Sequence, residues 1–330
     1  MYATPFHNID ISNKTIVVTG AAGFIGSNIV DYLLKYNVGK VIAIDNLATG
    51  HKENLEPFIG KTNFTFLQLD ITNEADLLTA FKGVDYIIHQ AALGSVPRSI
   101  EFPLATNHAN VTGFVTVLNA ARQAGVKRVV YASSSSVYGD SKILPKEESV
   151  IGNPLSPYAV SKLVDEFYGS VFARTYNMEI IGLRYFNIFG PNQSPSGAYA
   201  AAIPLFLNAL MNGKQPSIFG DGEQSRDFTF VENAVQANIK AMCCDAKFAN
   251  GNVFNIAYGK RITLNELLKL IGEKLNVKVN AEYKAERKGD VRDSLANIDK
   301  AKNAFDYNPE ISIEQGLQPT IDWFKQKFNL

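Results

Sequence analysis

The 330-residue sequence is poor in cysteine and tryptophan and carries no excess charge of either sign. Its two cysteines are neighbours, Cys243 and Cys244, so they provide no disulfide framework. A chain without disulfides is typical of the reducing cytoplasm, which is the location we expect. The 32 lysines and arginines balance the 32 aspartates and glutamates and are scattered, which argues against a nucleic-acid or membrane surface.

Long apolar runs and metal-ligand clusters are also missing. No uninterrupted apolar stretch reaches the length of about 18 residues that a transmembrane helix needs. The first residues, MYATPFHNIDISNK, contain no apolar segment of signal-peptide length. The four histidines are dispersed along the chain, so we expect structural roles for them and no metal site: His7, His51, His89 and His108.

Strand-like and helix-like stretches alternate from about residue 14 onward. Apolar, β-branched runs occupy 15–19, 40–45, 64–70, 84–91, 128–133 and 179–185, and helical periodicity occupies 24–36, 73–81, 106–124 and 156–176. This rhythm predicts βαβ units and a parallel sheet. Because the strands are apolar throughout, the sheet should be covered on both faces. The expected fold class is α/β, with a doubly wound parallel sheet.

The composition changes after Asn187, where a segment rich in Gly, Pro and Ser begins. Helical patterns follow at 204–212, 231–243, 263–275 and 313–327. We therefore predict a first domain over 1–187 and a smaller α/β substrate domain over 188–330, with a cleft between them. The stretch 252–258 is expected to return as a strand to the main sheet.

The segment TGAAGFIG (19–26) follows the first strand and opens the first helix. Gly20 permits a tight turn, Gly23 lets the backbone approach a pyrophosphate, and Gly26 lets the helix lie close to the sheet. Phe24 and Ile25 begin the helix, whose N-terminal N–H groups would face the phosphates. A turn that is glycine-rich for structural reasons alone is the alternative. The strand–turn–helix context favours a Rossmann-type dinucleotide site.

The next strands end in residues that suit the rest of a dinucleotide. Asp45 ends the second strand 19 residues beyond Gly26, where an acid can bind ribose hydroxyls. Asn46 follows, and no arginine stands beside it to pair with a 2′-phosphate, which favours NAD over NADP. The same site is expected to include these residues at the ends of the second, third and fourth strands: Gly50, Asp70, Ile71, Gln90 and Ala91. Capping of a helix is the alternative role for Asp70.

Tyr158 and Lys162, in PYAVSK, are four residues apart on a predicted helix and therefore share a face. A neighbouring ammonium group favours the phenolate, which can take a proton from a hydroxyl during hydride transfer. Upstream, the serine run 133–136 follows the strand 128–133. A serine hydroxyl can donate and accept as a carbinol becomes a carbonyl. This arrangement predicts a redox active site.

Taken together, the chain resembles the extended short-chain dehydrogenase/reductases over nearly its full length. The motifs that carry the resemblance are TGAAGFIG, DNLATG, LDIT, HQAA, NVTG, SSSSVYGD, PYAVSK, RYFNIFGP and GDGEQSRDFTFVEN. Within that group the sequence is most similar to nucleotide-sugar 4-epimerases that act on UDP-N-acetylhexosamines. The resemblance implies NAD as cofactor and a UDP-sugar as substrate.

Residue roles follow from this resemblance, position by position. It implies that Tyr158 is the catalytic base and acid, that Lys162 supports it, and that Ser134 is the catalytic serine. Tyr185 and Phe186 would line the nicotinamide. Further residues would contact the sugar, the diphosphate or the nucleoside: Gly94, Ser95, Ser135, Asn187, Ala201, Ala202, Arg226, Arg287, Asp290 and Ser294. Arginine suits phosphate because its planar fork donates two hydrogen bonds; a surface ion pair is the alternative for either one.

The resemblance implies a redox-neutral inversion at C4, most simply UDP-N-acetylglucosamine to UDP-N-acetylgalactosamine. Ser294 stands where 4-epimerases that reject acetylated sugars carry a tyrosine, so a small side chain leaves room for an acetamido group. A UDP-hexosaminuronate remains an alternative, with Ser135, Ser136 and Arg98 near its carboxylate, as does UDP-glucose/UDP-galactose.

Three other activities of this group are disfavoured by particular residues. Nucleotide-sugar 4,6-dehydratases carry Asp-Glu after the catalytic serine or threonine, where this chain has Ser135 and Ser136. UDP-glucuronate decarboxylases use a nearby glutamate that is also absent here. NAD-sensing proteins without catalysis usually lack the Tyr–Lys pair, which is present.

The two long predicted helices, 106–124 and 156–176, carry apolar residues on more than one face. One face must cover the sheet, and the resemblance implies that the other pairs with a second copy in a four-helix bundle. Burial under the chain's own loops is the alternative. The apolar residues are Val111, Phe114, Val117, Leu118, Leu163, Val164, Phe167 and Val171.

Overall fold

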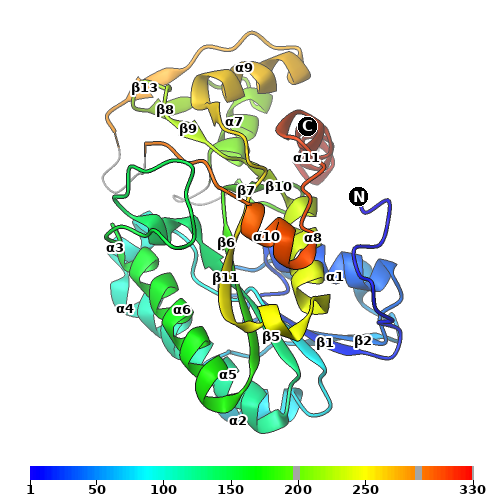
Figure 1. Cartoon of the computed structure of the whole chain (residues 1–330). Coiled ribbons are helices and arrows are strands. Elements are labelled where there is room, and N and C mark those ends of the chain that lie inside the picture. The colour runs from blue at the N-terminus through cyan, green and yellow to red at the C-terminus, as the bar shows by residue number, and fades with distance from the viewer. Residues whose placement is uncertain (196–200, 287–291, 329–330) are drawn as a thin grey trace.

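The computed structural model describes residues 1–195, 201–286 and 292–328, and its centre is a seven-stranded sheet (Figure 1). The strand order is β11-β6-β5-β4-β1-β2-β3, and every pairing is parallel. The strands are β1 (Thr15–Thr19), β2 (Lys40–Ile44), β3 (Phe64–Leu67), β4 (Tyr86–His89), β5 (Arg128–Ser134), β6 (Glu179–Tyr185) and β11 (Asn250–Ile256). The predicted doubly wound parallel sheet is confirmed.

Helices cover both faces of this sheet. One face carries α1 (Phe24–Lys35), α8 (Val231–Cys243) and α10 (Asp299–Phe305). The opposite face carries α2 (Glu74–Ala80), α5 (Gly113–Ala124) and α6 (Pro157–Tyr176). Because each central strand is buried from both sides, its residues are apolar without alternation, as at Ile16, Val17 and Val18 of β1, which are all fully buried.

Local sequence signals set the ends of α6. Ser156 caps its N-terminus by accepting a hydrogen bond from the Ala159 N–H at 3.2 Å, and Pro157 occupies the first helical position. The helix ends at Asn177, whose backbone is left-handed (φ 54°). These caps place Tyr158 and Lys162 in the first two turns.

The other long predicted helix, 106–124, is divided in the structure. It begins as α4 (Pro103–Asn107), continues through a π-helical turn (η3, His108–Thr112), and ends as α5 at Gly125. Gly125 adopts φ 71°, a left-handed conformation that glycine takes without strain.

Smaller elements lie beyond the carboxyl edge of the sheet, at the top of Figure 1. They have an apolar core of their own that includes Phe206, Leu267 and Leu317. The helices are α7 (Ala202–Met211), α9 (Leu264–Leu275) and α11 (Ile313–Phe328). Helix α3 (Val96–Glu101) lies instead beside α4 and α6. The strands pair as β7 (Ile188–Phe189) with β10 (Thr229–Phe230), β9 (Ser225–Arg226) with β12 (Ile262–Thr263), and β8 (Ser217–Phe219) with β13 (Glu282–Lys284).

Short 3₁₀ turns connect several of these elements: η1 (Lys52–Asn54), η2 (Glu56–Phe58), η4 (Ser135–Tyr138) and η5 (Ala246–Phe248). Within the described ranges, no helix combines the length and the apolarity required to cross a membrane. The strand order reverses between β1 and β4, and in open α/β sheets a crevice forms at the carboxyl ends of the strands at such a point. The functional site is therefore expected there.

Candidate active site

A cavity of about 770 Å³, here called the main cavity, lies at the carboxyl ends of the central strands. This volume lies in the range of ligand-binding clefts, about 300–1,000 Å³. It brings together most of the residues that the sequence analysis selected. They are Gly20, Gly23, Phe24, Ile25, Gly26, Asp45, Asn46, Gly50, Asp70, Ile71, Gln90, Ala91, Gly94, Ser95, Ser134, Ser135, Tyr158, Lys162, Tyr185, Asn187 and Ala201.

Two smaller cavities adjoin the main one through shared lining residues. The side cavity, about 230 Å³, is lined by Ala202 and Arg226 together with Asn187. The rear cavity, about 210 Å³, lies beside Tyr158 and is lined by Phe186 and Ser294 among others. Phe186 thus lines the rear cavity and not the main one where the nicotinamide was expected. Arg287 and Asp290 lie outside the described residues.

The glycine loop has no room for side chains. A Cβ on Gly20 would lie 2.6 Å from the Ala91 nitrogen, and a Cβ on Gly26 would lie 2.1 Å from the Gly20 carbonyl oxygen. Gly23, which caps α1, offers no side-chain cap, so the first N–H groups of the helix remain available to a ligand. This cradle of open helix N–H groups against the cavity fits a pyrophosphate.

Asp45 forms the wall next to the glycine loop. Its carboxylate accepts hydrogen bonds from the Ala22 N–H at 3.0 Å and the Leu47 N–H at 2.8 Å. Burial raises the pKa of Asp45, while these backbone donors act in the opposite direction. A Cβ on Gly50 would lie 2.8 Å from the carboxylate, so this glycine allows the loop to pass close to the acid.

Asp70 does not cap a helix, because Asn73 is the N-cap of α2. Its carboxylate accepts hydrogen bonds from the Thr72 hydroxyl at 2.7 Å and from the Asn46 side-chain amide at 2.8 Å. The bond from Thr72 is the main cause that lowers the pKa of Asp70. An ionised acid at this position leaves an acceptor at the cavity wall, and the capping alternative is excluded.

Tyr158, Lys162 and Ser134 line the main cavity from two elements. Tyr158 and Lys162 come from the first turns of α6, and Ser134 ends β5. The Lys162 ammonium is buried and donates to the Ala132 carbonyl oxygen at 3.0 Å. The Ser134 hydroxyl oxygen accepts from the Ser136 N–H at 3.1 Å, which fixes the oxygen and leaves its proton to bond a ligand.

Three polar side chains at the floor of the cavity form a closed set of hydrogen bonds. The Asn238 amide donates to the Tyr185 hydroxyl at 2.7 Å, and that hydroxyl donates to the Gln90 carbonyl oxygen at 3.1 Å. The Gln90 amide then donates to the Asn238 oxygen at 3.1 Å. Burial raises the pKa of Tyr185 above its ordinary value, so its hydroxyl stays a neutral donor. Asn238, on α8, gave no signal in the sequence.

Asn110 is a second buried residue that the sequence analysis did not select. It lies in the π-helical turn η3, a deformation that is frequent at functional sites. Its side chain accepts from the Leu93 N–H at 2.8 Å and donates to the Ser161 hydroxyl at 2.9 Å. It therefore links the cavity loop at Leu93 to helix α6 between Tyr158 and Lys162. The quoted motif NVTG, which begins at Asn110, was the available signal.

Ser95 and Asn187 hold unusual backbone conformations where they line the main cavity. Their φ angles are 154° and 38°, values that non-glycine residues adopt at a cost of about 1–3 kcal/mol. Ser95 caps α3 by accepting from the Arg98 N–H at 3.2 Å. Asn187 donates to the Asp227 carbonyl oxygen and to the Ser294 hydroxyl, both at 3.2 Å.

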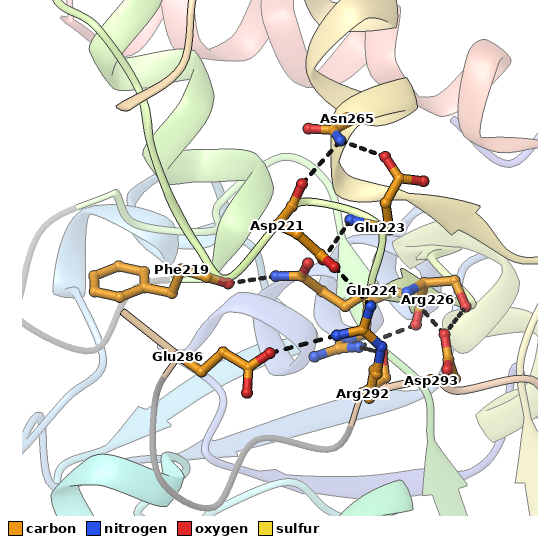
Figure 2. Close-up of polar contacts among 10 residues, drawn as sticks. Phe219, Asp221, Glu223, Gln224, Arg226, Asn265, Glu286, Arg292 and Asp293 are labelled. Atoms are coloured by element: carbon orange, nitrogen blue, oxygen red, sulfur yellow. Dashed lines mark hydrogen bonds and ion pairs between the residues drawn. The ribbon is translucent and has the colours of Figure 1, made fainter. Parts of the chain in front are cut away.

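A network of charged and polar side chains surrounds Arg226 beside the side cavity (Figure 2). The Arg226 guanidinium donates to the Arg292 carbonyl oxygen at 2.6 Å. Arg292 in turn forms ion pairs with Asp221 at 2.8 Å and Glu286 at 3.4 Å. Arg292 is half exposed and was not selected from the sequence. The Gln224 amide donates to the Phe219 carbonyl, which holds the apolar wall of this cavity.

Asp227 joins the segments that surround Asn187 and Ser294. Its fully buried carboxylate accepts from the Gly259 N–H and the Ala296 N–H, each at 3.2 Å. Its own N–H donates to the Ser294 hydroxyl at 3.3 Å. Burial is the main cause that raises the pKa of Asp227, to about 7. Among the described residues, no group of three or more His, Cys, Asp or Glu could hold a metal ion.

The glycine loop yields a first prediction. Gly20→Ala would place a methyl group 2.6 Å from the Ala91 nitrogen in a backbone with φ 66°. The loop must then move away from the phosphates, and we expect NAD affinity to fall by tenfold or more, about 1.4 kcal/mol or more. The measurement is a binding isotherm for NAD on the purified variant. The control is Gly83→Ala, with φ 71° and nothing within 4 Å of its Cβ; equal losses in both variants would contradict the argument.

Comparisons with known proteins agree with this geometry. Residues 16–257 match the model of the NAD dependent epimerase/dehydratase family. The structure resembles a UDP-N-acetylglucosamine 4-epimerase from Methanobrevibacter ruminantium M1, solved with UDP-N-acetylmuramic acid, at a TM-score of 0.89 and 41% identity over 95% of this chain and 99% of that one.

Two further relatives align over nearly their full lengths. A UDP-glucuronic acid 4-epimerase from Bacillus cereus, solved with UDP-glucuronic acid and NAD, has a TM-score of 0.88 and 29% identity, over 95% of this chain and 99% of that one. A UDP-glucose 4-epimerase of Mycolicibacterium smegmatis is 36% identical over 94% of this chain and 98% of its own length. The chain therefore belongs to the NAD-dependent epimerase/dehydratase family, and its cofactor is NAD.

Proposed function

We propose that this chain is a UDP-sugar 4-epimerase and that UDP-N-acetylglucosamine and UDP-N-acetylgalactosamine are its substrates. The observation that carries the proposal is the meeting of Tyr158, Lys162 and Ser134 with the glycine loop in one cavity. The three similar proteins described above carry 4-epimerase names, and the sugars in those names are UDP-N-acetylglucosamine, UDP-glucuronic acid and UDP-glucose. We further propose that the chain has two parts. Residues 1–187, together with β11, bind the cofactor, and the rest of 188–330 binds the sugar nucleotide.

The proposed reaction inverts C4 without net oxidation. Tyr158, as phenolate, accepts the proton of the C4 hydroxyl, and the Ser134 hydroxyl donates to the oxygen as it becomes a carbonyl. The chemistry that NAD would supply when bound is to accept a hydride from C4 and to return it to the opposite face of C4. The 4-keto sugar turns about its bond to the diphosphate between these events. Tyr158 then returns the proton to the oxygen.

Anchoring of UDP lets the sugar turn without leaving the site. Arg226 and Asn187 line both the side cavity and the rear cavity, so they lie between the nucleoside and the hexose in this proposal. A guanidinium can bind two phosphate oxygens at once, which holds the diphosphate through both orientations of the sugar. Arg287 is proposed as its partner on the diphosphate.

Elimination of water across C5–C6, the dehydratase reaction, needs a general acid near the sugar. The positions after Ser134 hold Ser135 and Ser136, which line the rear cavity beside Tyr158. A hydroxyl group cannot supply the carboxylic proton that such an elimination requires. These two serines therefore favour epimerisation over dehydration.

Replacement of the proposed base tests the mechanism. Tyr158→Phe removes the proton acceptor while keeping the ring, and we expect kcat to fall by about 10²–10⁴-fold with NAD still bound. NMR of UDP-N-acetylglucosamine incubated with the enzyme follows the galacto epimer directly. Tyr168→Phe is the matched control, because Tyr168 is 38% exposed on the same helix.

Wild-type speed in Tyr158→Phe would refute the assigned base. Absence of turnover by the wild-type protein with any UDP-hexose would refute the enzyme proposal and favour an NAD-sensing role.

Ser294 is proposed to set the sugar size, because it is small and lines the rear cavity next to Tyr158. Ser294→Tyr should fill this space, so kcat/KM for UDP-N-acetylglucosamine should fall about tenfold or more relative to UDP-glucose. Ser294→Ala is the control: it removes the hydrogen bonds from Asn187 and Asp227 but keeps the volume. The size argument would be contradicted if Ser294→Tyr and Ser294→Ala changed the ratio of kcat/KM for the two sugars equally.

The same measurement on the UDP-hexosaminuronates decides between the proposed substrate and its alternative. The Ser136 hydroxyl in the rear cavity is buried without a hydrogen-bond partner among the described residues. A polar sugar substituent would satisfy it. If kcat/KM were higher for the UDP-hexosaminuronates than for the UDP-N-acetylhexosamines, the proposed substrate would be wrong and the uronate would take its place.

We also propose a homodimer through a four-helix bundle. Phe114, Val117 and Leu118 are fully buried within the subunit, so they cannot serve a partner. An exposed apolar face remains on α6 and the neighbouring helices α3 and α4. It comprises Ile100, Phe102, Leu104, Val160, Phe167 and Val171, which are 44–85% exposed. Exposed apolar groups gathered in this way are typical of interfaces.

Phe167→Glu tests the dimer. Phe167 is 59% exposed on α6, and a carboxylate there would have to be desolvated in the bundle. Sedimentation velocity should show a dimer for the wild type and a monomer for the variant. Ile59→Glu, at a position 56% exposed outside this face, should leave the dimer intact; a monomeric wild type would overturn the proposal.

A further inference from the structure

Asp165 is a buried acid behind the catalytic helix face that the mechanism above does not use. Residues 158, 162 and 165 follow the spacing i, i+4, i+7, so they form one stripe along α6. Tyr158 and Lys162 line the main cavity, whereas Asp165 is 1% exposed and lies below it. Its carboxylate oxygen Oδ2 lies 3.1 Å from the Lys162 ammonium.

The neighbouring acid cannot take this role. Glu166 accepts two hydrogen bonds from Arg184, at 2.8 and 2.7 Å, and one from the Ser133 hydroxyl at 2.5 Å. In the described part of the chain, Asp165 is therefore the carboxylate that pairs with Lys162. The other partner of Lys162, the Ala132 carbonyl, carries no net charge.

The remaining titratable groups around this pair are neutral or balanced by a partner. On β4, burial foremost and the charge of Lys162 next lower the pKa of His89 to about 3. On β5, burial foremost raises the pKa of Tyr131, with Glu166 and Asp165 acting in the same direction. Arg184, on β6, is balanced by Glu166. Among the residues that the structure describes, the buried charges beneath Tyr158 that remain are those of Lys162 and Asp165.

Stability alone does not account for a carboxylate at this position. Its Oδ1 atom is buried without a partner among the described residues, and so is the Tyr131 hydroxyl. Burial raises the pKa of Asp165 to about 6, although Lys162 acts to lower it. Apolar residues in place of a buried ion pair are often neutral or stabilising. A buried acid with these costs, next to a lysine that lines the cavity, points to a role in the site.

We propose that Asp165 is a positioning residue of the reaction: its carboxylate fixes the Lys162 ammonium beneath Tyr158 and determines the pH range in which the site is correctly charged. The inference rests on the proposed function, because it concerns the base of that reaction. Removal of a negative charge makes the local potential more positive, so neighbouring groups lose their protons at lower pH. Both limbs of the pH profile should therefore move in the same direction.

Asp165→Asn keeps the size and one oxygen acceptor but removes the charge. We expect both limbs of its pH profile of kcat/KM for UDP-N-acetylglucosamine to shift to lower pH. The matched control is Asp299→Asn, because Asp299 also lies three residues from a lysine, Lys302, but at the surface and 3.9 Å away. Its profile should coincide with that of the wild type.

Asp165→Glu restores the charge one methylene farther out. We expect its limbs to return to the wild-type pH while kcat falls several-fold at unchanged KM, because the ammonium is displaced. The proposal would be overturned if the limbs of the pH profile did not move in Asp165→Asn. It would also be overturned if the loss of activity in both variants only followed the loss of folded protein and of bound NAD. Thermal unfolding and NAD content measured on the same samples supply that comparison.

A readout without substrate separates this proposal from the proposed function. The ultraviolet difference between each protein and its Tyr158→Phe counterpart reports ionisation of Tyr158 alone. This titration should shift to lower pH in Asp165→Asn whether or not any UDP-hexose turns over. A shift without turnover would refute the proposed epimerase activity but support the role of Asp165. Turnover without a shift would support the epimerase activity but refute the role of Asp165.

Discussion

The buried ion pair between Glu166 and Arg184 joins helix α6, which carries Tyr158 and Lys162, to strand β6. Glu166 lies on α6 one turn beyond Lys162, and Arg184 lies on β6 next to Tyr185. Glu166 also accepts a hydrogen bond from Ser133 on β5, the residue before Ser134. A carboxylate and a guanidinium that are both buried must remain paired, because an unpaired partner costs about 3–5 kcal/mol. The distance between helix and serine strand is thereby held.

The same guanidinium extends this support to the loop after the serines. Arg184 donates to the Tyr138 hydroxyl at 3.0 Å, and that hydroxyl donates to the Asn255 side-chain oxygen at 2.6 Å. Asn255 belongs to β11, the strand that returns late in the chain to pair with β6. The C-terminal half therefore helps to position the serine run, and the two halves cooperate in one site.

Sequence patterns predicted the sheet, its helices and the cavity-lining motifs, because these depend on local periodicity and on glycines at fixed spacings. The predicted strand 40–45 is β2, Lys40–Ile44, and the predicted helix 156–176 is α6. The π-helical turn at His108–Thr112 was not predicted, because one wider turn leaves almost no trace in the apolar spacing.

Some site residues were missed because their roles arise only when distant segments meet. Asn238 contacts Gln90 across 148 positions of sequence, and Arg292 contacts Asp221 across 71. No motif spacing links such pairs. Asp165 was overlooked for a different reason: on a helix, an acid three residues after a lysine is usually a surface pair, and burial beneath the cavity is a tertiary property.

The exposed ion pairs of Arg292 with Asp221 and Glu286 in Figure 2 contrast with the buried pairs of Lys162 with Asp165 and of Arg184 with Glu166. Dissolved ions screen exposed charges over about 8 Å at physiological ionic strength and reach buried pairs far less. The two ends of the site therefore differ in their response to the surrounding medium. Salt weakens the contacts beside Arg226, where the nucleotide end is proposed, and leaves the electrostatics around Lys162, where the reaction is proposed, in place.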